Sequence, residues 1–157
     1  MRPDLLKRYA APVPRYTSYP TAPHFSPTVD AATYARWLDE LAGDLPFSLY
    51  VHIPFCNELC WYCGCSTKIT KQPAPIARYL DALLVEIETI GRRMKPGHRV
   101  THMHWGGGSP SILAPDDIAR LSAALHSRFS FVENAEFAVE MDPRGLDASR
   151  IEAFARA

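Results

Sequence analysis

The chain has 157 residues, of which 47% are hydrophobic and 11% aromatic, so its size and composition are those of one globular domain. Its 17 Lys and Arg residues balance 17 Asp and Glu residues, so no net charge attracts nucleic acid or an anionic membrane. We recognise neither a secretory leader nor an apolar run of about 20 residues, and we expect a cytoplasmic protein without a membrane span.

Residues 1–45 are predicted to form an N-terminal arm followed by a helix. Residues 1–25 are rich in Pro, Tyr and Arg and lack periodicity, which indicates an extended arm. Ser26 and Pro27 suit an N-cap and the first helical position, and Gly43 can end the helix. Apolar residues recur between them at helical spacing, namely Tyr34, Trp37, Leu38 and Leu41.

Residues 46–157 alternate between strand and helix patterns. Strands are predicted over about 47–53, 100–105 and 135–141, and helices over about 76–92, from the acidic residues after Pro115, and from about Asp147. This alternation predicts an α/β fold with parallel strands, the first three β/α units of a TIM-like barrel. Three units leave a strand edge open, so we expect the front portion of a larger, apparently truncated enzyme.

The four cysteines fall within ten residues, and the first three follow the spacing CxxxCxxC. A cubane iron–sulfur cluster normally takes four thiolates. Three closely spaced thiolates hold three irons and leave the fourth open, which is where S-adenosylmethionine binds in radical-SAM enzymes. We therefore predict that Cys56, Cys60 and Cys63 ligate a [4Fe–4S] cluster.

Other interpretations of the cysteines are less favoured. A structural zinc site would need a second ligand pair at a distance, and the six histidines are scattered. Disulfides would need an oxidising compartment. Cys65 lies outside the three-cysteine spacing and has two interpretations, a buried small hydrophobe or a reactive, substrate-facing thiol that takes part in catalysis.

Besides the cysteine loop, two features lie at predicted strand ends, where barrels of this class gather their functional groups: the run Gly106–Gly108 with Ser109, and Glu140. Tyr50 lies within the first predicted strand as a polar residue between apolar neighbours and needs a partner there. Glycines let a backbone approach a ligand closely, although a loose turn is the alternative. Glu140 is as well explained by an exposed charge on an edge strand as by a ligand contact. His52 and His104 are interpreted as structural histidines.

Five segments together resemble, in order and spacing, the oxygen-independent coproporphyrinogen III oxidases of the radical-SAM superfamily. The segments are 14–22, 50–55, the cysteine run 56–65, 104–110 and 140–144. The resemblance spans nearly the whole chain and about the first third of a typical family member.

The resemblance implies a role for each candidate residue. Cys56, Cys60 and Cys63 would be the cluster ligands. Tyr50, Gly107 and Glu140 would contact the S-adenosylmethionine on the cluster, and Tyr62 would lie near its adenine. Gly108 and Ser109 would contact a second S-adenosylmethionine; the family often has threonine where this chain has Ser109.

The implied reaction is the oxidative decarboxylation of two propionate side chains of coproporphyrinogen III to vinyl groups, in haem biosynthesis. A flavodoxin or ferredoxin system would supply the electron, and the full-length protein would be a monomer. The alternative is a related haem chaperone, which typically has phenylalanine two residues after the third cysteine and lacks the Arg-Tyr-Thr-Ser-Tyr-Pro arm. This chain has Cys65 there and has the arm, and both favour the oxidase. We expect the chain alone to be inactive.

Overall fold

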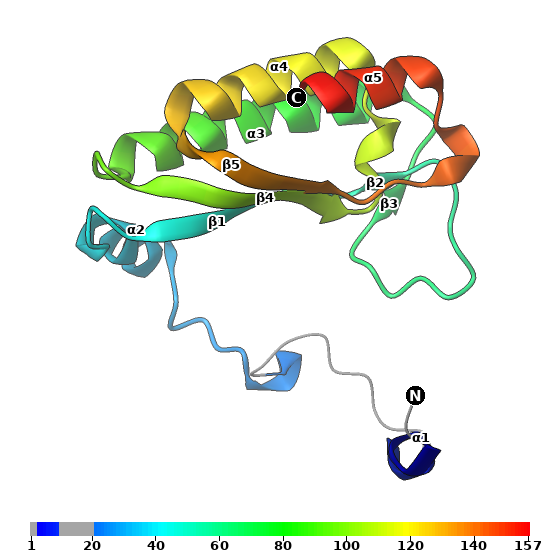
Figure 1. Cartoon of the computed structure of the whole chain (residues 1–157), viewed down its shortest axis with the longest axis horizontal. Coiled ribbons are helices and arrows are strands. Elements are labelled where there is room, and N and C mark those ends of the chain that lie inside the picture. The colour runs from blue at the N-terminus through cyan, green and yellow to red at the C-terminus, as the bar shows by residue number, and fades with distance from the viewer. Residues whose placement is uncertain (1–2, 10–20) are drawn as a thin grey trace. The chain divides into compact units, whose positions relative to one another are not determined.

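The structure, a computed structural model, describes residues 3–9 and 21–157 (Figure 1). The chain divides into residues 1–34 and residues 35–157. The first part contains the helix α1 (Pro3–Tyr9) and the short 3-10 helix η1 (Ala22–His24). The predicted extended arm is therefore wrong for residues 3–9. Residues 10–20, which carry most of the arm segment of the resemblance, lie outside the described residues.

The next helix, α2 (Ala31–Glu40), is shorter than predicted at both ends. The predicted start at Ser26 and Pro27 is wrong, because Asp30 acts as the cap: its Oδ1 accepts a hydrogen bond from the backbone N–H of Thr33 at 2.8 Å. That bond lowers the pKa of Asp30. Of the four apolar residues at helical spacing, Leu38 alone is buried.

Three parallel strands form the main sheet, in the order β1 (Pro46–Ile53), β4 (Arg99–Gly107) and β5 (Ser130–Val139). Both pairings are parallel, which confirms the predicted βα arrangement. Three bounds differ from the prediction by more than one residue. β4 continues through the first two glycines, and β5 begins five residues earlier than 135 and ends one residue before Glu140.

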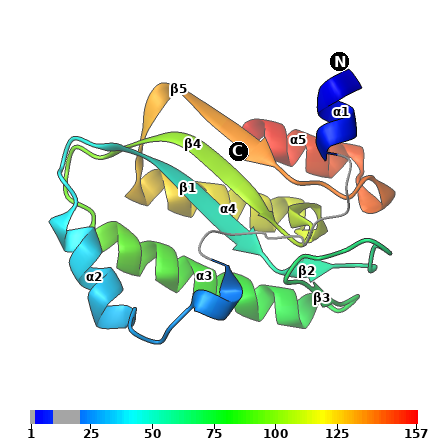
Figure 2. The same ribbon diagram turned by 90° about the horizontal axis from the view of Figure 1, so that it is seen from below.

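Three helices cover one face of this sheet: α3 (Pro73–Arg93), α4 (Pro115–Arg128) and α5 (Ala148–Arg156) (Figure 2). All three were predicted, although α3 begins three residues early. Pro73 and Pro75 lie in its first turn, where no intrahelical N–H is required. None of the helices in the described ranges has the length and hydropathy of a membrane span.

The hydrophobic core lies between the sheet and these helices. Trp105 of β4 is fully buried, and its ring meets Phe137 of β5 and Phe154 of α5 edge to face, with ring centroids 5.3 and 5.9 Å apart. Other fully buried core residues come from β1, β4 and α3 to α4: Ile53, Val100, Leu80, Leu113, Ile118, Leu121 and Leu125. Because only this face of the sheet is buried, the alternate side chains of each strand point to the opposite face and do not pack in the core.

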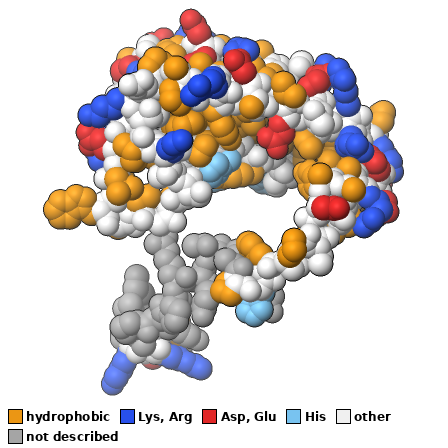
Figure 3. Space-filling view, turned by 180° about the vertical axis from the view of Figure 1, so that it is seen from behind, with side chains coloured by type: hydrophobic (Ala, Val, Ile, Leu, Met, Phe, Trp, Pro, Cys, Tyr) orange, Lys and Arg blue, Asp and Glu red, His pale blue; other side chains and the backbone are white. Residues whose placement is uncertain are grey.

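The opposite face of the sheet carries polar side chains. Tyr50 and His104 alternate with the buried Val51 and Trp105 and so lie on this face, where Glu140 meets His104. No described element of residues 35–157 covers this face of the sheet (Figure 2). In the space-filling view, charged side chains lie mainly over the helices, and a histidine side chain shows on the underside of the sheet (Figure 3). This uncovered polar face leads to the carboxyl ends of the strands, where the candidate site lies.

Candidate metal and cofactor site

The cysteine loop is closed at its base by two short strands that the sequence analysis missed. β2 (Phe55–Cys56) pairs in parallel with β3 (Lys68–Ile69). The backbone N–H of Lys68 donates to the Pro54 carbonyl at 2.7 Å, and that of Thr70 donates to the Cys56 carbonyl at 3.0 Å. These bonds fix both ends of the loop directly after β1. Two-residue strands have no periodicity by which a sequence could reveal them.

The four cysteines are free thiols in the structure. Cys56, Cys60 and Cys63 are half-buried, and a turn joins the last two, with the Cys63 N–H donating to the Cys60 carbonyl at 3.0 Å. Two sulfurs have polar neighbours: Cys56 Sγ lies 3.2 Å from Thr67 Oγ1, and Cys60 Sγ accepts from Arg144 Nη2 at 3.3 Å. Within residues 3–9 and 21–157, no three His, Cys, Asp or Glu side chains are gathered as a metal site. Ligation by the three cysteines therefore stays a prediction.

Cys65 is exposed, so its interpretation as a buried small hydrophobe is wrong. The pKa of its thiol is raised, first by partial desolvation, then by the neighbouring Cys63 and, to a lesser degree, by Glu140 and Cys56. Cys65 therefore lies within electrostatic reach of both the other thiols and the carboxylate at the end of β5.

At each of the three consecutive glycines, a different group occupies the space that a Cβ would need. A Cβ on Gly106 would lie 2.9 Å from the Glu140 carboxyl carbon, and one on Gly107 would lie 2.4 Å from the His52 ring. Gly107 also has a backbone φ of +107°, a conformation that residues with a side chain rarely adopt. A Cβ on Gly108 would lie 2.5 Å from the carbonyl oxygen of Phe55.

The alternative of a loose turn at these glycines is therefore wrong. The Gly108 N–H donates to the Ile53 carbonyl at 2.9 Å, and the Ser109 N–H donates to the Phe55 carbonyl at 2.8 Å. The segment is held against the end of β1 and against β2, beside the cysteine loop.

Glu140 follows β5 directly and lies at this end of the sheet. Its Oε2 accepts from the Gly107 N–H at 3.1 Å, and its own N–H donates to the Trp105 carbonyl at 2.9 Å. Its Oε1 lies 3.3 Å from His104 Nε2, close enough for an ion pair when His104 is protonated, although the two atoms are not aligned for a hydrogen bond. Glu140 therefore points toward the glycines and not away from them.

Tyr50 joins this group from β1. Its hydroxyl lies 3.0 Å from His52 Nδ1, and its ring meets the His104 ring edge to face at 5.6 Å. Partial burial, and then the charge of Glu140, raise the pKa of Tyr50. His52 Nε2 in turn lies 3.3 Å from the Ser66 carbonyl, within the cysteine loop. The structure thus brings Tyr50, Gly107 and Glu140 together, with His52 linking them to the loop.

Ser109 and Tyr62 are placed differently from this group. Ser109 is buried, and its hydroxyl lies 2.8 Å from the Ser111 hydroxyl and accepts from the Asp142 N–H at 2.9 Å. The Ser109 hydroxyl therefore stabilises the chain after β5. Tyr62 and its neighbour Trp61, in contrast, are almost wholly exposed on the cysteine loop.

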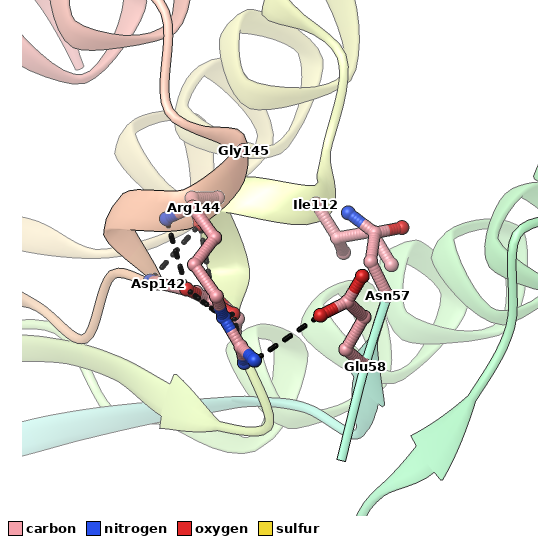
Figure 4. A pocket seen from close by; sticks show the side chains of 8 residues that line it. Asn57, Glu58, Ile112, Asp142, Arg144 and Gly145 are labelled. Atoms are coloured by element: carbon pink, nitrogen blue, oxygen red, sulfur yellow. Dashed lines mark hydrogen bonds and ion pairs between the residues drawn. The ribbon is translucent and has the colours of Figure 1, made fainter. Parts of the chain in front are cut away.

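A small pocket of about 190 Å³ lies between this chain segment and the cysteine loop (Figure 4). Its lining comes from both sides and from the segment after β4: Asn57, Glu58, Ser109, Ser111, Ile112, Asp142, Arg144 and Gly145. Sequence reasoning missed Asp142 and Arg144 as site residues. The signal available was their place directly after Glu140, at the end of a strand.

Arg144 spans this pocket. Its Nε donates to Asp142 Oδ1 at 2.9 Å and its Nη2 to Asp142 Oδ2 at 2.7 Å, and these bonds lower the pKa of Asp142. Its Nη1 donates to Glu58 Oε2 at 3.3 Å. The guanidinium therefore connects the short 3-10 helix η3 (Pro143–Gly145) to the cysteine loop.

Several known proteins similar to this chain have the same activity in their names. Relatives named oxygen-independent coproporphyrinogen III oxidase are 54% identical in Bradyrhizobium diazoefficiens and 41% identical in Escherichia coli K12, over 98% and 97% of this chain. A solved structure of coproporphyrinogen III oxidase from Escherichia coli, described as a radical SAM enzyme, matches with a TM-score of 0.82 and 37% identity. The matched region covers 97% of this chain and 33% of the chain in the solved structure. The chain spans about a third (34%) of the length of both named relatives.

The model of the radical SAM superfamily matches residues 50–157, the part that holds the sheet, the cysteine loop and the glycines. This match and the structural likeness confirm the predicted α/β class with the parallel strands of a radical SAM barrel. Membership implies a [4Fe–4S] cluster and S-adenosylmethionine. The chain belongs to the radical SAM superfamily.

Proposed function

We propose that this chain is the cluster-binding part of an oxygen-independent coproporphyrinogen III oxidase. One observation carries the proposal: the CxxxCxxC loop begins where β1 ends, beside the group formed by Tyr50, Gly107 and Glu140. Thiolate donors and a polar cofactor platform thus share one end of the sheet. Relatives with this activity in their names match the chain over nearly its whole length.

The cysteine loop suits an iron–sulfur cluster by its chemistry. Cys56, Cys60 and Cys63 would be the ligands, as free, half-buried thiols on a loop fixed at both ends. The hydroxyl of Thr67 lies beside one sulfur and the Arg144 guanidinium donates to another. Hydrogen bonds of this kind stabilise thiolate ligands. When bound, the cluster and S-adenosylmethionine together supply one-electron chemistry.

The residues beside the loop suit the cofactor S-adenosylmethionine. The Glu140 carboxylate would pair with its ammonium group, the Gly107 backbone allows close approach, and Tyr50 would bound the site from β1. Tyr62, which is exposed on the loop, would lie near the adenine. We propose that Gly108 and Ser109 contact a second S-adenosylmethionine, with the Ser109 hydroxyl held in place by Ser111 and the Asp142 N–H.

The proposed substrate is coproporphyrinogen III, in which two propionate side chains become vinyl groups. Each propionate would lose carbon dioxide, one hydrogen atom to the radical chemistry that S-adenosylmethionine supplies, and one electron to an external one-electron acceptor. We propose that a flavodoxin or ferredoxin system reduces the cluster, that the full-length protein is a monomer and that it acts in the cytoplasm, where reductants preserve free thiols. A role for Cys65 in catalysis stays a proposal, based on its exposure beside Glu140.

The test is product formation under anaerobic conditions. A protein that contains this chain and matches the relatives in full length is loaded with iron and sulfide and given S-adenosylmethionine, reductant and coproporphyrinogen III. We expect the vinyl product from this protein and none from the 157-residue chain alone, whose described pockets near the loop are too small for a tetrapyrrole. Haem binding by the longer protein without vinyl product would favour the chaperone instead.

A further inference from the structure

Arg144 makes a contact that spans 84 residues of the sequence, from η3 to the cysteine loop. Its Nη2 donates to Cys60 Sγ at 3.3 Å. An N–H group aimed at a cysteine sulfur is unusual for a surface arginine, whose ordinary partners are carboxylates and water. The contact places a positive charge at one of the three proposed cluster ligands.

The guanidinium is held firmly in this position. Asp142 binds it through both carboxylate oxygens, and the backbone N–H of Arg144 also donates to Asp142 Oδ1 at 3.0 Å. Asp142 is fixed in turn, because its own N–H donates to the buried Ser109 hydroxyl at 2.9 Å. A planar guanidinium bound on two sides has lost its freedom before it meets the sulfur, so the N–H···S bond costs little further entropy.

Two carboxylates surround the same guanidinium. Asp142 lies on one side, and Glu58 accepts from Nη1 at 3.3 Å on the other (Figure 4). Glu58 stands two residues before Cys60, so its charge also lies close to the ligand sulfur. Arg144 therefore offsets two negative charges beside the proposed cluster, and its removal would leave both uncompensated.

We propose that Arg144 is a positioning residue that raises the reduction potential of the cluster held by Cys60; this inference rests on the proposed function. Reduction adds one negative charge to the cluster. An N–H···S hydrogen bond and a nearby cation stabilise the reduced form, whereas a nearby carboxylate destabilises it. Arg144 and Glu58 are thus expected to shift the potential in opposite directions.

A contact that only fastened the loop would have other consequences. It would change iron content or thermal stability in the same direction for either partner of the Arg144–Glu58 pair. It would not give potential shifts of opposite sign. The sign of the shift therefore separates electrostatic control from a structural role.

The experiment is an anaerobic redox titration of the reconstituted protein, followed by the electron paramagnetic resonance signal of the reduced cluster. The variants are Arg144→Met, Arg144→Lys and Glu58→Gln, and iron per protein is measured for each. Arg120→Met is the matched control, because Arg120 pairs with Asp81 at 2.9 Å on the helical side of the sheet.

We expect Arg144→Met to shift the reduction equilibrium at least tenfold toward the oxidised form, which is about 59 mV for a one-electron couple. Arg144→Lys should fall between this variant and the unaltered protein, Glu58→Gln should shift the potential upward, and Arg120→Met should not change it. An unchanged potential in Arg144→Met with full iron content would overturn the inference.

Two further outcomes are decisive. If Arg144→Met takes up no iron, the Lys and Gln variants decide the question, and equal potentials in those two would overturn the inference. If the unaltered protein forms no [4Fe–4S] cluster at all, the proposed function fails. That result differs from a cluster that forms but whose reduction potential does not depend on Arg144, which overturns the further inference alone.

Discussion

The Glu140 carboxylate accepts a hydrogen bond from the Gly107 backbone N–H at 3.1 Å, across the pairing of β5 with β4. It also fills the space that a side chain on Gly106 would take. The acid is therefore fixed at the end of the sheet by the glycines themselves. The consecutive glycines are required by protein contacts even before any cofactor is considered.

We predict that Gly106→Ala weakens S-adenosylmethionine binding while largely preserving stability. The new Cβ would lie 2.9 to 3.0 Å from the carboxyl atoms of Glu140, the end of a flexible side chain, so the carboxylate would swing away and lose its bond to Gly107. The displaced carboxylate would no longer meet the ammonium group of S-adenosylmethionine, and a hydrogen bond to a charged group contributes roughly 1.5–3 kcal/mol, which is about tenfold or more in affinity. Titration calorimetry on the cluster-loaded protein measures the affinity for S-adenosylmethionine. An unchanged affinity would show that Glu140 does not contact the cofactor.

We predict that Gly108→Ala, unlike Gly106→Ala, lowers the stability of the fold. Its Cβ would meet the backbone of Phe55 at 2.5 and 2.7 Å, and backbone in a paired strand has little room to move. Overpacking of this kind costs roughly 1–3 kcal/mol. We expect a lower urea midpoint, with Gly145→Ala as the control because its Cβ would meet its nearest neighbour at an ordinary 3.6 Å. Equal midpoints for the two variants would contradict the packing around Gly108.

Much of the fold follows from the sequence because burial is one-sided. The helices α3 and α4 were predicted from apolar spacing, since each buries one face against the same sheet, and α5 was predicted only by its start near Asp147. The first half of β5 was missed for a local reason. Its pairing with β4 jumps from Phe131 to Glu136, so the alternation of buried and exposed residues is interrupted.

The candidate site was predictable only in part. Cysteine spacing and strand ends singled out Cys56, Cys60, Cys63 and Glu140, because those signals are local. Arg144 and Thr67 were missed, since their meaning depends on contacts with sulfurs 84 and 11 residues away. The contact of Ser109 with a second S-adenosylmethionine stays a prediction, and the sequence did not reveal that its hydroxyl contacts Ser111 and accepts from the Asp142 N–H.

Trp105 is predicted to be a major contributor to stability. It is fully buried against Phe137 and Phe154, so Trp105→Ala should destabilise the protein by about 3–5 kcal/mol. Trp105→Phe should cost less than the alanine variant, because it leaves a smaller cavity and the indole Nε1 has no hydrogen-bond partner in the described part of the chain. Trp61→Ala is the matched control, since Trp61 is wholly exposed. Chemical denaturation measures the free energy of unfolding of all three variants. Equal losses for the two alanine variants would contradict the burial of Trp105 in the core.

Asp147 gives a pH-dependent prediction away from the cysteines. The Ser149 hydroxyl and the Arg150 backbone N–H donate to its carboxylate at the start of α5, and they lower its pKa. A lowered folded-state pKa means that the stabilisation is present above the unfolded pKa of about 3.9 and is lost as pH falls through the folded value. Asp147→Asn keeps a capping oxygen and removes the titration.

The stability advantage of the unaltered protein over Asp147→Asn should therefore be constant near neutral pH and shrink below about pH 4. Thermal unfolding followed by circular dichroism from pH 6 to pH 3 measures the difference, in which the other carboxyl groups cancel. A difference that grows on acidification would contradict the capping role.

The most direct test of the account is iron content after anaerobic reconstitution of four single variants, Cys56→Ala, Cys60→Ala, Cys63→Ala and Cys65→Ala. Three half-buried thiols on a closed loop are proposed as ligands, and the exposed Cys65 is not. We expect the first three variants to lose the cluster and its visible absorption, while Cys65→Ala keeps the iron content and spectrum of the unaltered protein. Loss of iron in Cys65→Ala, or retention of a full cluster in any of the other three, would contradict the three-cysteine site.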